Sequence, residues 1–435
     1  MSTTNIVVFG ATGTPAACYL QCSHADATGT AGFTCRLMPD YLAHHPKRTS
    51  FTFGVAGRSQ LAKLEALKKG LGLNDTENYV EEAVKSAQVE EAVKSAQVVV
   101  NAVGPSIYWD EPVLRVCLKH RRQYVELCEE TPGLSSRPSR RYGYVDTKAS
   151  VLLVPSCGFD SVPAELVVYV ANKTLKATLC PRTSLGPSLT VYRANGGFSG
   201  GTLASMMAIA ENVPIEKLQE VQADYALGPA IGKSGVKDML WYEVPFAVPN
   251  RVAMYFFMAP SNRVIVQLAR AGCAGLVERH KRELSIRNTN GVGSVGSSGR
   301  VSPAWISNTS QLAHSLLLQV IWFLKHLATP PGPSEEKMKI GFFQIKNHSR
   351  SVHAPGIPEV PIRTVMRGQG DPGYLLSARM MIPESALAIV LEKDKLPRMA
   401  QEGGILTPAT AFGDVLGRGG RRSYMESVGI IIDLY

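Results

Sequence analysis

The 435-residue sequence predicts an α/β protein, with a doubly wound parallel sheet at the N-terminus and a second α+β domain after it. Short runs of apolar, β-branched residues alternate with helical patterns through the first part of the chain, which is typical of parallel sheets. The first of these runs, residues 5–9, ends at a glycine-rich turn. From about Asn195 the pattern changes to glycine-rich segments and mixed elements, which indicates a second region.

The expected strands of the parallel sheet are almost uniformly apolar, as strands buried on both faces should be. They occupy residues 5–9, 51–56, 98–103, 124–127 and 150–154. Helical patterns lie between them, at residues 33–42, at residues 59–70 with Ser59 as N-cap, and at residues 111–120. This alternation predicts the doubly wound order of strands.

The turn Gly10-Ala11-Thr12-Gly13 follows the first strand directly. Glycine has no side chain to keep the backbone N–H groups away from a pyrophosphate, so a turn of this kind suits a dinucleotide. Its place after an N-terminal strand predicts a Rossmann-type domain in which Gly10, Ala11, Thr12 and Gly13 bind the cofactor. Two continuations of this loop stay open: a helix that begins at Thr14-Pro15, or the helical pattern at residues 33–42.

Two further strand ends bear on the cofactor. Arg58 follows the second strand, where a basic residue suits the 2′-phosphate of NADP better than the free hydroxyl of NAD. NADP is therefore favoured over NAD, with a surface arginine as the alternative. A central strand ends in residues that are expected to line the crevice at the carboxyl edge of the sheet, namely Asn101, Val103, Gly104 and Pro105.

Candidate chemical groups follow the later strands. Tyr108 is the best candidate for a proton donor by type and position, with a packed aromatic ring as the alternative. Glu126, Asp160 and Ser161 are candidates for substrate contact, with structural hydrogen bonds as the alternative. Cys157 is expected to be a buried thiol rather than a nucleophile, because no histidine lies near it in the sequence.

Several classes of protein are not supported by the sequence. The eight cysteines and nine histidines lack the spacing of metal ligands, so no metal site is expected. The formal charge of +10 comes without a nucleic-acid-binding motif, so a solvated surface is expected rather than a nucleic-acid partner. Only residues 1–5 precede the first apolar run, which leaves no room for a secretory signal and favours a cytoplasmic location.

Three other segments stand out. Residues 312–327 are apolar but too short to span a bilayer, which leaves a packed helix or peripheral contact with a lipid surface. Residues 80–88 and 89–97 are identical copies of VEEAVKSAQ, which we interpret as a local duplication that lengthens a helix or loop. Residues 287–300 are rich in Gly, Ser and Asn and are expected to form an exposed loop.

An ordered set of motifs resembles the saccharopine dehydrogenase-like oxidoreductases. The matching segments are GATG at 10–13, AGR at 56–58, VNAVGP at 100–105, EPVLRVC at 111–117, YVELCEETP at 124–132, CGFDSVP at 157–163, GGFSGGTLAS at 196–205, DPGY at 371–374 and GGILTPA at 403–409. This family includes trans-acting enoyl reductases and a eukaryotic branch associated with lipid droplets and membranes. The resemblance implies a Rossmann domain at residues 1–165, an α+β substrate or dimerisation domain at 166–410, and a tail at 411–435, for which a return to the first domain is one option.

The resemblance also implies that Phe33 and Thr34 continue the cofactor loop, with Cys35 where a third glycine is usual. Residues 14–32 then form an insertion, for which a retained intron translated in frame is our hypothesis. The implied function is NADP-dependent hydride transfer to or from a lipid- or polyketide-like small molecule. The alternative is a Rossmann-fold protein that has lost catalysis and serves as a scaffold on lipid droplets or membranes. The resemblance leaves open two further interactions, a peripheral contact with a membrane or lipid droplet and the formation of a homodimer.

Overall fold

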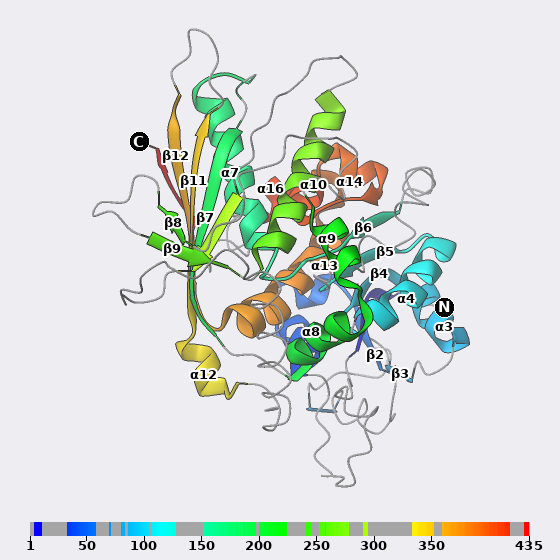
Figure 1. The fold of residues 1–435 in the computed structure, drawn as a ribbon. Coiled ribbons are helices and arrows are strands. Elements are labelled where there is room, and N and C mark those ends of the chain that lie inside the picture. The colour runs from blue at the N-terminus through cyan, green and yellow to red at the C-terminus, as the bar shows by residue number, and fades with distance from the viewer. Residues whose placement is uncertain are drawn as a thin grey trace.

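Two seven-stranded sheets form the framework of the protein (Figure 1). The computed structural model describes residues 4–10, 33–57, 69–70, 80–82, 86–103, 106–127, 151–181, 183, 185–196, 200–223, 241–244, 252–256, 258–277, 290–294, 333–351, 359–417 and 430–434. The predicted α/β class, with one parallel sheet and a second α+β region, is confirmed.

The first sheet is parallel throughout and has the strand order β13-β6-β5-β4-β1-β2-β3. Its strands are β1 (Thr4–Phe9), β2 (Phe53–Gly57), β3 (Val80–Glu82), β4 (Ala96–Asn101), β5 (Gln123–Glu126), β6 (Leu152–Val154) and β13 (Gly404–Ile405). The chain moves outward from β1 to β3 on one side and from β4 to β6 on the other. The direction of winding therefore reverses between β1 and β4, and in sheets of this kind ligands bind at that reversal.

Alternate side chains of the central strands face two different helix layers. Ile6 and Val8 of β1 belong to the same apolar cluster as α1 (Phe33–Ala43) and α13 (Ile382–Leu391). Val7 and Phe9 belong instead to a second cluster with α3 (Ser86–Ser95) and α4 (Ser106–His120). The uniformly apolar strands predicted from the sequence are thus explained by burial on both faces.

The helix α13 comes from near the end of the chain and continues a π-helical segment, η3 (Pro372–Met381). The side chain of Asp371 starts this segment by accepting from the backbone N–H groups of Gly373 and Tyr374, both at 3.0 Å. Residues 372–391 are long and apolar enough to cross a membrane, but 67% of their apolar window is buried inside the protein. They pack on α1, β4 and β5, which identifies this segment as a core helix.

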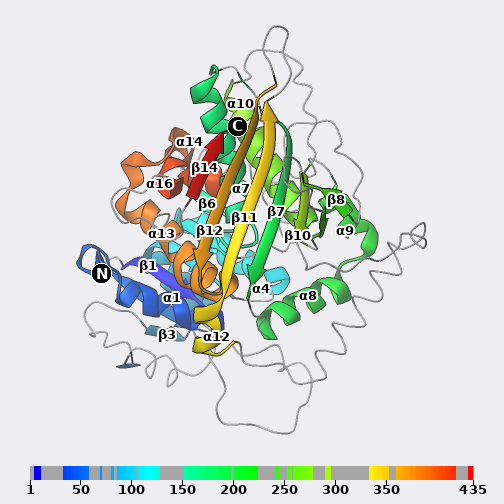
Figure 2. The ribbon, with the colours of Figure 1, turned by 90° about the vertical axis from the view of Figure 1, so that its left-hand side faces the viewer.

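The second sheet is mixed and has the order β14-β12-β11-β7-β10-β9-β8. Its strands are β7 (Leu185–Asn195), β8 (Trp241–Glu243), β9 (Val252–Tyr255), β10 (Asn290–Ser294), β11 (Phe342–Ser351), β12 (Pro361–Gln369) and β14 (Ile430–Leu434). Two helices, α7 (Val162–Thr178) and α10 (Ala259–Val277), contact this sheet. In Figure 2 they lie behind β12, β11 and β7.

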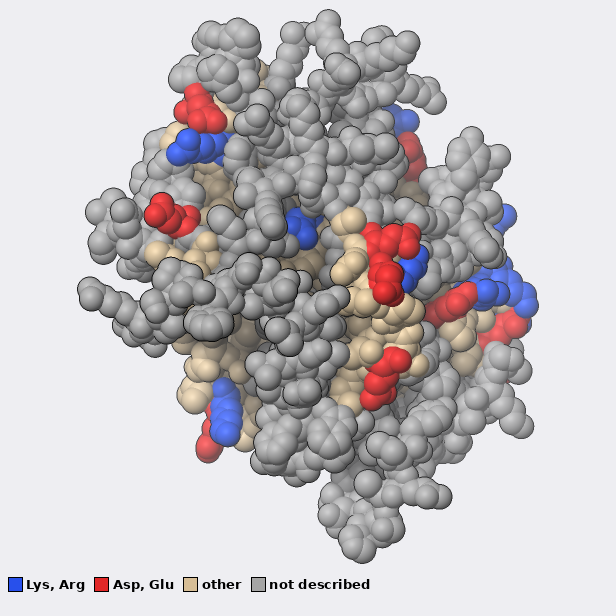
Figure 3. Space-filling model, in the orientation of Figure 1, with Lys and Arg blue, Asp and Glu red and all other residues tan. Residues whose placement is uncertain are grey.

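The remaining described elements connect or cover these layers. They are η2 (Arg48–Ser50), α8 (Gly200–Asn212), α9 (Ile215–Gln222), α12 (Glu335–Ile340), η4 (Lys393–Lys395), α14 (Arg398–Glu402), α15 (Pro408–Phe412) and α16 (Asp414–Gly417). On the face drawn in Figure 3, the described basic and acidic side chains lie near one another in mixed groups.

Three segments differ from their sequence-based expectations. The prediction of an exposed loop at residues 287–300 is wrong for residues 290–294, which form β10. This strand pairs with β7 and β9, so that its backbone hydrogen bonds are made within the sheet. For the tail at residues 411–435, the sequence left open a return to the first domain. The last described element of this tail, β14, instead pairs with β12 of the second sheet. The strand that does join the first sheet from this part of the chain is β13, at residues 404–405. The apolar segment at 312–327 lies outside the described residues.

Candidate functional site

The carboxyl edge of the first sheet is fixed by a series of backbone hydrogen bonds just beyond the strand ends. Gly10 donates to Ala56 at 2.9 Å, and Ala102 donates to Phe9 at 3.2 Å. The same arrangement continues across β5, where the N–H of Leu127 donates to the carbonyl of Asn101 at 3.2 Å. These hydrogen bonds hold the backbone at neighbouring strand ends together, including at the reversal between β1 and β4.

Gly10 has a conformation that side-chain-bearing residues rarely adopt. Its φ is +96°, at the point where the chain leaves β1. A Cβ atom would strain the backbone there, so the glycine that begins the predicted cofactor turn is required by the local geometry. The other residues of that turn, Ala11, Thr12 and Gly13, lie outside the described residues.

The helix α1 begins at the same edge of the sheet. It is 11 residues long, about 16 Å, and the chain that leaves it reaches the beginning of β1, where the Thr52 N–H donates to Asn5 Oδ1 at 2.8 Å. Its C-terminus therefore lies towards the amino edge and its N-terminus towards the carboxyl edge near Gly10. The positive end of its backbone dipole suits the phosphates of a dinucleotide.

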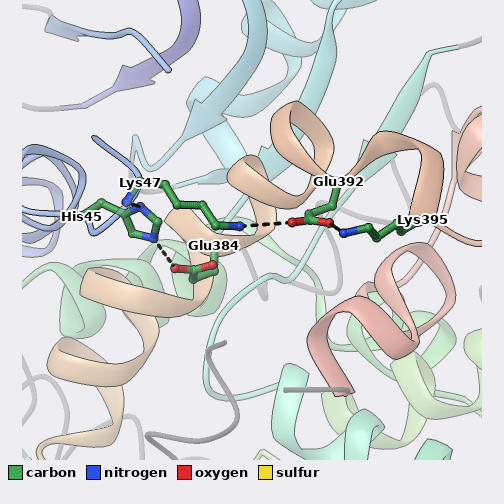
Figure 4. A network of polar contacts seen from close by, with 5 residues as sticks. All are labelled: His45, Lys47, Glu384, Glu392 and Lys395. Atoms are coloured by element: carbon green, nitrogen blue, oxygen red, sulfur yellow. Dashed lines mark hydrogen bonds and ion pairs between the residues drawn. The ribbon is translucent and has the colours of Figure 1, made fainter. Parts of the chain in front are cut away.

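Contacts from α13 hold the C-terminal end of α1 and the chain after it (Figure 4). The Tyr41 hydroxyl donates to Glu384 Oε1 at 2.5 Å, and His45 Nε2 lies 3.1 Å from the same oxygen. Lys47 Nζ pairs with Glu392 Oε1 at 3.1 Å. Burial, together with the Glu384 carboxylate, raises the pKa of Tyr41, so this hydroxyl stays protonated and keeps donating.

A buried polar network occupies the ends of β4 and β5. Asn101 Nδ2 donates to Asp110 Oδ1 at 2.7 Å and to the Tyr124 hydroxyl at 2.9 Å. That hydroxyl donates in turn to Glu126 Oε2 at 2.5 Å. The Asn101 Oδ1 accepts from the Val103 N–H at 3.3 Å. Both amide hydrogens of Asn101 are thus directed into the protein, and its oxygen shapes the backbone that leads from β4 into α4.

The network could be found from the sequence only in part. Asn101 and Glu126 were recognisable as polar residues at the ends of apolar strands. Tyr124 shares a face of β5 with Glu126 because side chains alternate along a strand, and that spacing was an available signal. Asp110 is brought in by the start of α4, and nothing in the linear pattern marks it.

The connection from β6 to α7 also lies at the carboxyl edge, where the Cys157 N–H donates to the Glu126 carbonyl at 2.8 Å. Ser156 is buried and has a φ of +58°, a costly conformation for a residue with a side chain. Cys157 is buried, as expected, and burial raises the pKa of its thiol, which disfavours the nucleophilic thiolate. Ser161 is buried before α7, whereas Asp160 is partly exposed.

This connection is also where the two sheets meet. The Phe159 N–H donates to Ser377 Oγ at 2.9 Å, and the Phe159 ring packs edge-on against Phe343 of β11 with centroids 5.1 Å apart. Asp160 and Ser161 therefore lie between the carboxyl edge of the first sheet and the second sheet. Their predicted contact with a substrate stays a prediction.

For the other predicted site residues, the structure describes either the backbone alone or neither backbone nor side chain. Phe33 and Thr34 begin α1, and Tyr108 lies in the first turn of α4, but their side chains are not described. Arg58, Gly104 and Pro105 lie outside the described residues. Among the residues that the structure describes, no group of three His, Cys, Asp or Glu side chains is placed to hold a metal ion.

Comparison with known proteins gives a consistent set of relatives, although no family model matches the chain. It is 28% identical over 409 residues to a Mycobacterium tuberculosis protein named as a trans-acting enoyl reductase, covering 89% of this chain and 93% of the relative. A human saccharopine dehydrogenase-like oxidoreductase is 23% identical, covering 89% and 92% of the two chains. A Caenorhabditis elegans lipid droplet localized protein is 26% identical, covering 89% and 93%. The structure of a saccharopine dehydrogenase from Saccharomyces cerevisiae aligns over 99% of this chain and 100% of that chain, with 11% identity and a TM-score of 0.47.

Proposed function

We propose that this chain, a relative of the saccharopine dehydrogenase-like oxidoreductases and trans-acting enoyl reductases, is an oxidoreductase that uses a nicotinamide dinucleotide. The observation that carries this proposal is the carboxyl edge between β1 and β4. Gly10 with its positive φ, the start of α1 and the shaped backbone after Asn101 meet at the reversal of winding. These features fit a dinucleotide because the first turn of α1 presents the positive end of the helix and its N–H groups, while Gly10 has no side chain to block the approach.

The finer assignments rest on residues at the same edge. Arg58 follows directly on Gly57, the last residue of β2, and would hold the 2′-phosphate, so the proposed cofactor is NADP. The cofactor supplies or accepts the hydride when it is bound. The protein would position the loop after β4 through Asn101 and deliver a proton from Tyr108 in the first turn of α4. The mycobacterial relatives are named as enoyl reductases, so the proposed substrate carries an enoyl group within a lipid- or polyketide-like molecule.

A lipid-surface role is the second proposal, and one structural observation favours it. Trp241, Val252 and Met254 are 44%, 54% and 42% exposed on the hairpin of β8 and β9, where Trp241 is the register partner of Met254. Exposed aromatic and apolar side chains grouped in this way suit the interface of a membrane or lipid droplet. One relative is named for a lipid droplet location. A cytoplasmic protein that associates peripherally with such surfaces, as a monomer or homodimer, agrees with both proposals.

Titration with NADPH and NADH, followed by cofactor fluorescence, tests the enzyme proposal. We expect saturable binding of NADPH, and Arg58→Ala should raise the Kd for NADPH about tenfold or more while changing NADH binding much less, because it removes a charge-assisted contact to one phosphate. Lys339→Ala on the exposed face of α12 is the charge-matched control and should change neither Kd.

Equal losses for the two cofactors would contradict the role of Arg58. Absence of binding up to millimolar cofactor would reject the enzyme proposal for this chain and leave the lipid-surface role.

A further inference from the structure

A cavity lies at the amino edge of the first sheet, at the opposite end of the strands from the carboxyl edge where the cofactor is proposed to bind. It has a volume of about 260 Å³. It is lined by the first residues of β5 and β6, Gln123 and Leu152, together with Gln97 near the start of β4. Arg121 and Arg122 line one side, and Lys393, just beyond α13, lines another. Three cationic residues thus surround one small space.

Arg121 occupies a position where the backbone favours glycine. Its N–H donates to the carbonyl of Leu118, and the N–H of Arg122 donates to the carbonyl of Cys117, which together form the two-bond closure of a helix C-terminus. The residue between helix and strand in this motif is left-handed, and Arg121 has a φ of +53°. Glycine is usual there because any side chain adds strain. The end of α4 would be closed equally well by glycine, so capping does not account for an arginine.

Two acidic side chains of the neighbouring elements are engaged with other cations. Glu392 lies between Lys47 and Lys395 (Figure 4). Glu90 pairs with Lys94, Lys119 and His120.

Within the part of the chain that the structure describes, Arg121, Arg122 and Lys393 have no carboxylate partner. Arg122 donates through Nη2 to the carbonyl of Lys94 at 2.6 Å, while its Nε is buried without a hydrogen-bond partner.

We propose that this cavity is a binding site for a small oxyanion, carrying phosphate or carboxylate oxygens. Arg121 and Arg122 provide planar donors of the kind that bind such oxygens in pairs, and Lys393 adds a third charge. The apolar wall formed by Leu152, Ile389 and Leu396 reduces the screening of these charges by water. The site is distinct from the cofactor edge, since the two lie at opposite ends of the same strands, and it does not depend on the proposed enzyme activity.

Calorimetric titration of the full chain with inorganic phosphate and, separately, with succinate tests this site and distinguishes the two kinds of oxygen. Saturable binding of at least one anion is expected in the presence of saturating NADPH, because the cofactor competes only for the opposite edge. The double variant Arg121→Gly, Lys393→Gln should weaken this binding at least tenfold. Lys339→Gln, which removes one charge from α12, is the matched control and should bind as the wild type does.

Arg121→Gly by itself separates binding from folding. Glycine relieves the left-handed strain, so the Tm of this variant should equal or exceed that of the wild type while its affinity for the anion falls. Unchanged affinity in the double variant, displacement of the anion by NADPH, or absence of saturable binding of both anions would each overturn the proposal. A chain that fails to bind NADPH but binds the anion would refute the proposed cofactor alone.

Discussion

At the scale of single residues, Glu165 shows how burial changes the chemistry of a side chain. It lies in the first turn of α7 and is 2% exposed. Its carboxylate accepts from the Thr407 hydroxyl and from the Ala409 N–H, the latter at 2.9 Å, and so satisfies the start of α15. Burial outweighs these hydrogen bonds and raises the pKa of Glu165 to about 7.

The raised pKa predicts an unusual pH dependence of stability. The folded state holds the proton of Glu165 more tightly than the unfolded state, where the pKa is 4.5. The stabilisation is therefore complete below pH 4.5 and is lost as the pH rises to about 7, by about 3 kcal/mol in total. Glu165→Gln should remove this slope in urea unfolding measured from pH 4 to pH 8.

Glu392→Gln provides a comparison of opposite sign. Hydrogen bonding to Lys395 lowers the pKa of Glu392, so its contribution is present above pH 4.5 and is lost at lower pH. A slope between pH 4.5 and pH 7 that persists in Glu165→Gln would show that another group titrates there.

The candidate site was predictable at this scale only where a residue ends a strand. Gly10, Asn101 and Glu126 lie at the carboxyl edge, as their positions after apolar runs indicated. The partners of Asn101 were not predictable, because Asp110 and Tyr124 reach it from different elements. A hydrogen bond between side chains depends on distances that the spacing along the chain does not determine.

At the scale of elements, β1 and α1 are anchored independently of the segment between them. β1 is paired on both sides, with β2 and β4. α1 is held by Tyr41 and Glu384, and by an ion pair between Asp40 and Arg379 at 2.9 Å. These contacts require nothing from residues 14–32.

Deletion of residues 14–32 should therefore leave the fold intact. Joining Gly13 to Phe33 shortens the connection between β1 and α1 from 23 residues to 4, which lowers the entropic cost of closing the loop by about 1.5 kcal/mol. The variant should unfold at the same or a higher urea concentration, with equal or tighter NADPH binding.

Deletion of residues 287–300 is the contrasting variant. It removes β10, which bridges β7 and β9, and should be destabilising. If both deletions lowered stability equally, residues 14–32 would have to be part of the folded structure.

At the scale of the whole molecule, one apolar core joins the two sheets. Ile6 of β1, Leu166 of α7 and Ile345 of β11 belong to the same buried cluster. α7 follows the first sheet along the chain and packs on the second, where the Thr364 hydroxyl donates to the carbonyl of Val167 at 2.9 Å. The sequence-based boundaries at 165 and 410 therefore separate regions that share a core.

This shared core predicts cooperative unfolding. Phe343→Ala removes a ring that is 1% exposed and contacts Phe159 at the junction, and should cost about 3–5 kcal/mol. Circular dichroism and NADPH release should then report one transition, shifted to lower temperature for both. Phe53→Ala, in the core of the first sheet, is the matched substitution and should shift the same single transition. Two separate transitions, with only one moved by each variant, would contradict a common core.

The sequence by itself determined the five apolar strands β1, β2, β4, β5 and β6, because their uniformly apolar runs specify strands buried on both faces. The short strands β3 and β13 carry no such pattern, and the tertiary structure alone placed them at the two edges of the sheet. The tertiary structure decided the fate of the duplicated nonapeptide. Residues 80–82 form β3 beside β2. The identical tripeptide at residues 89–91 lies within α3, where Glu90 pairs with Lys94 and Lys119. Identical sequences have identical local preferences, so the difference comes from their surroundings. The edge of β2 pairs with the first copy, whereas the apolar side chains of the second copy, Ala92 and Val93, pack in the cluster that α3 shares with α4 and β4.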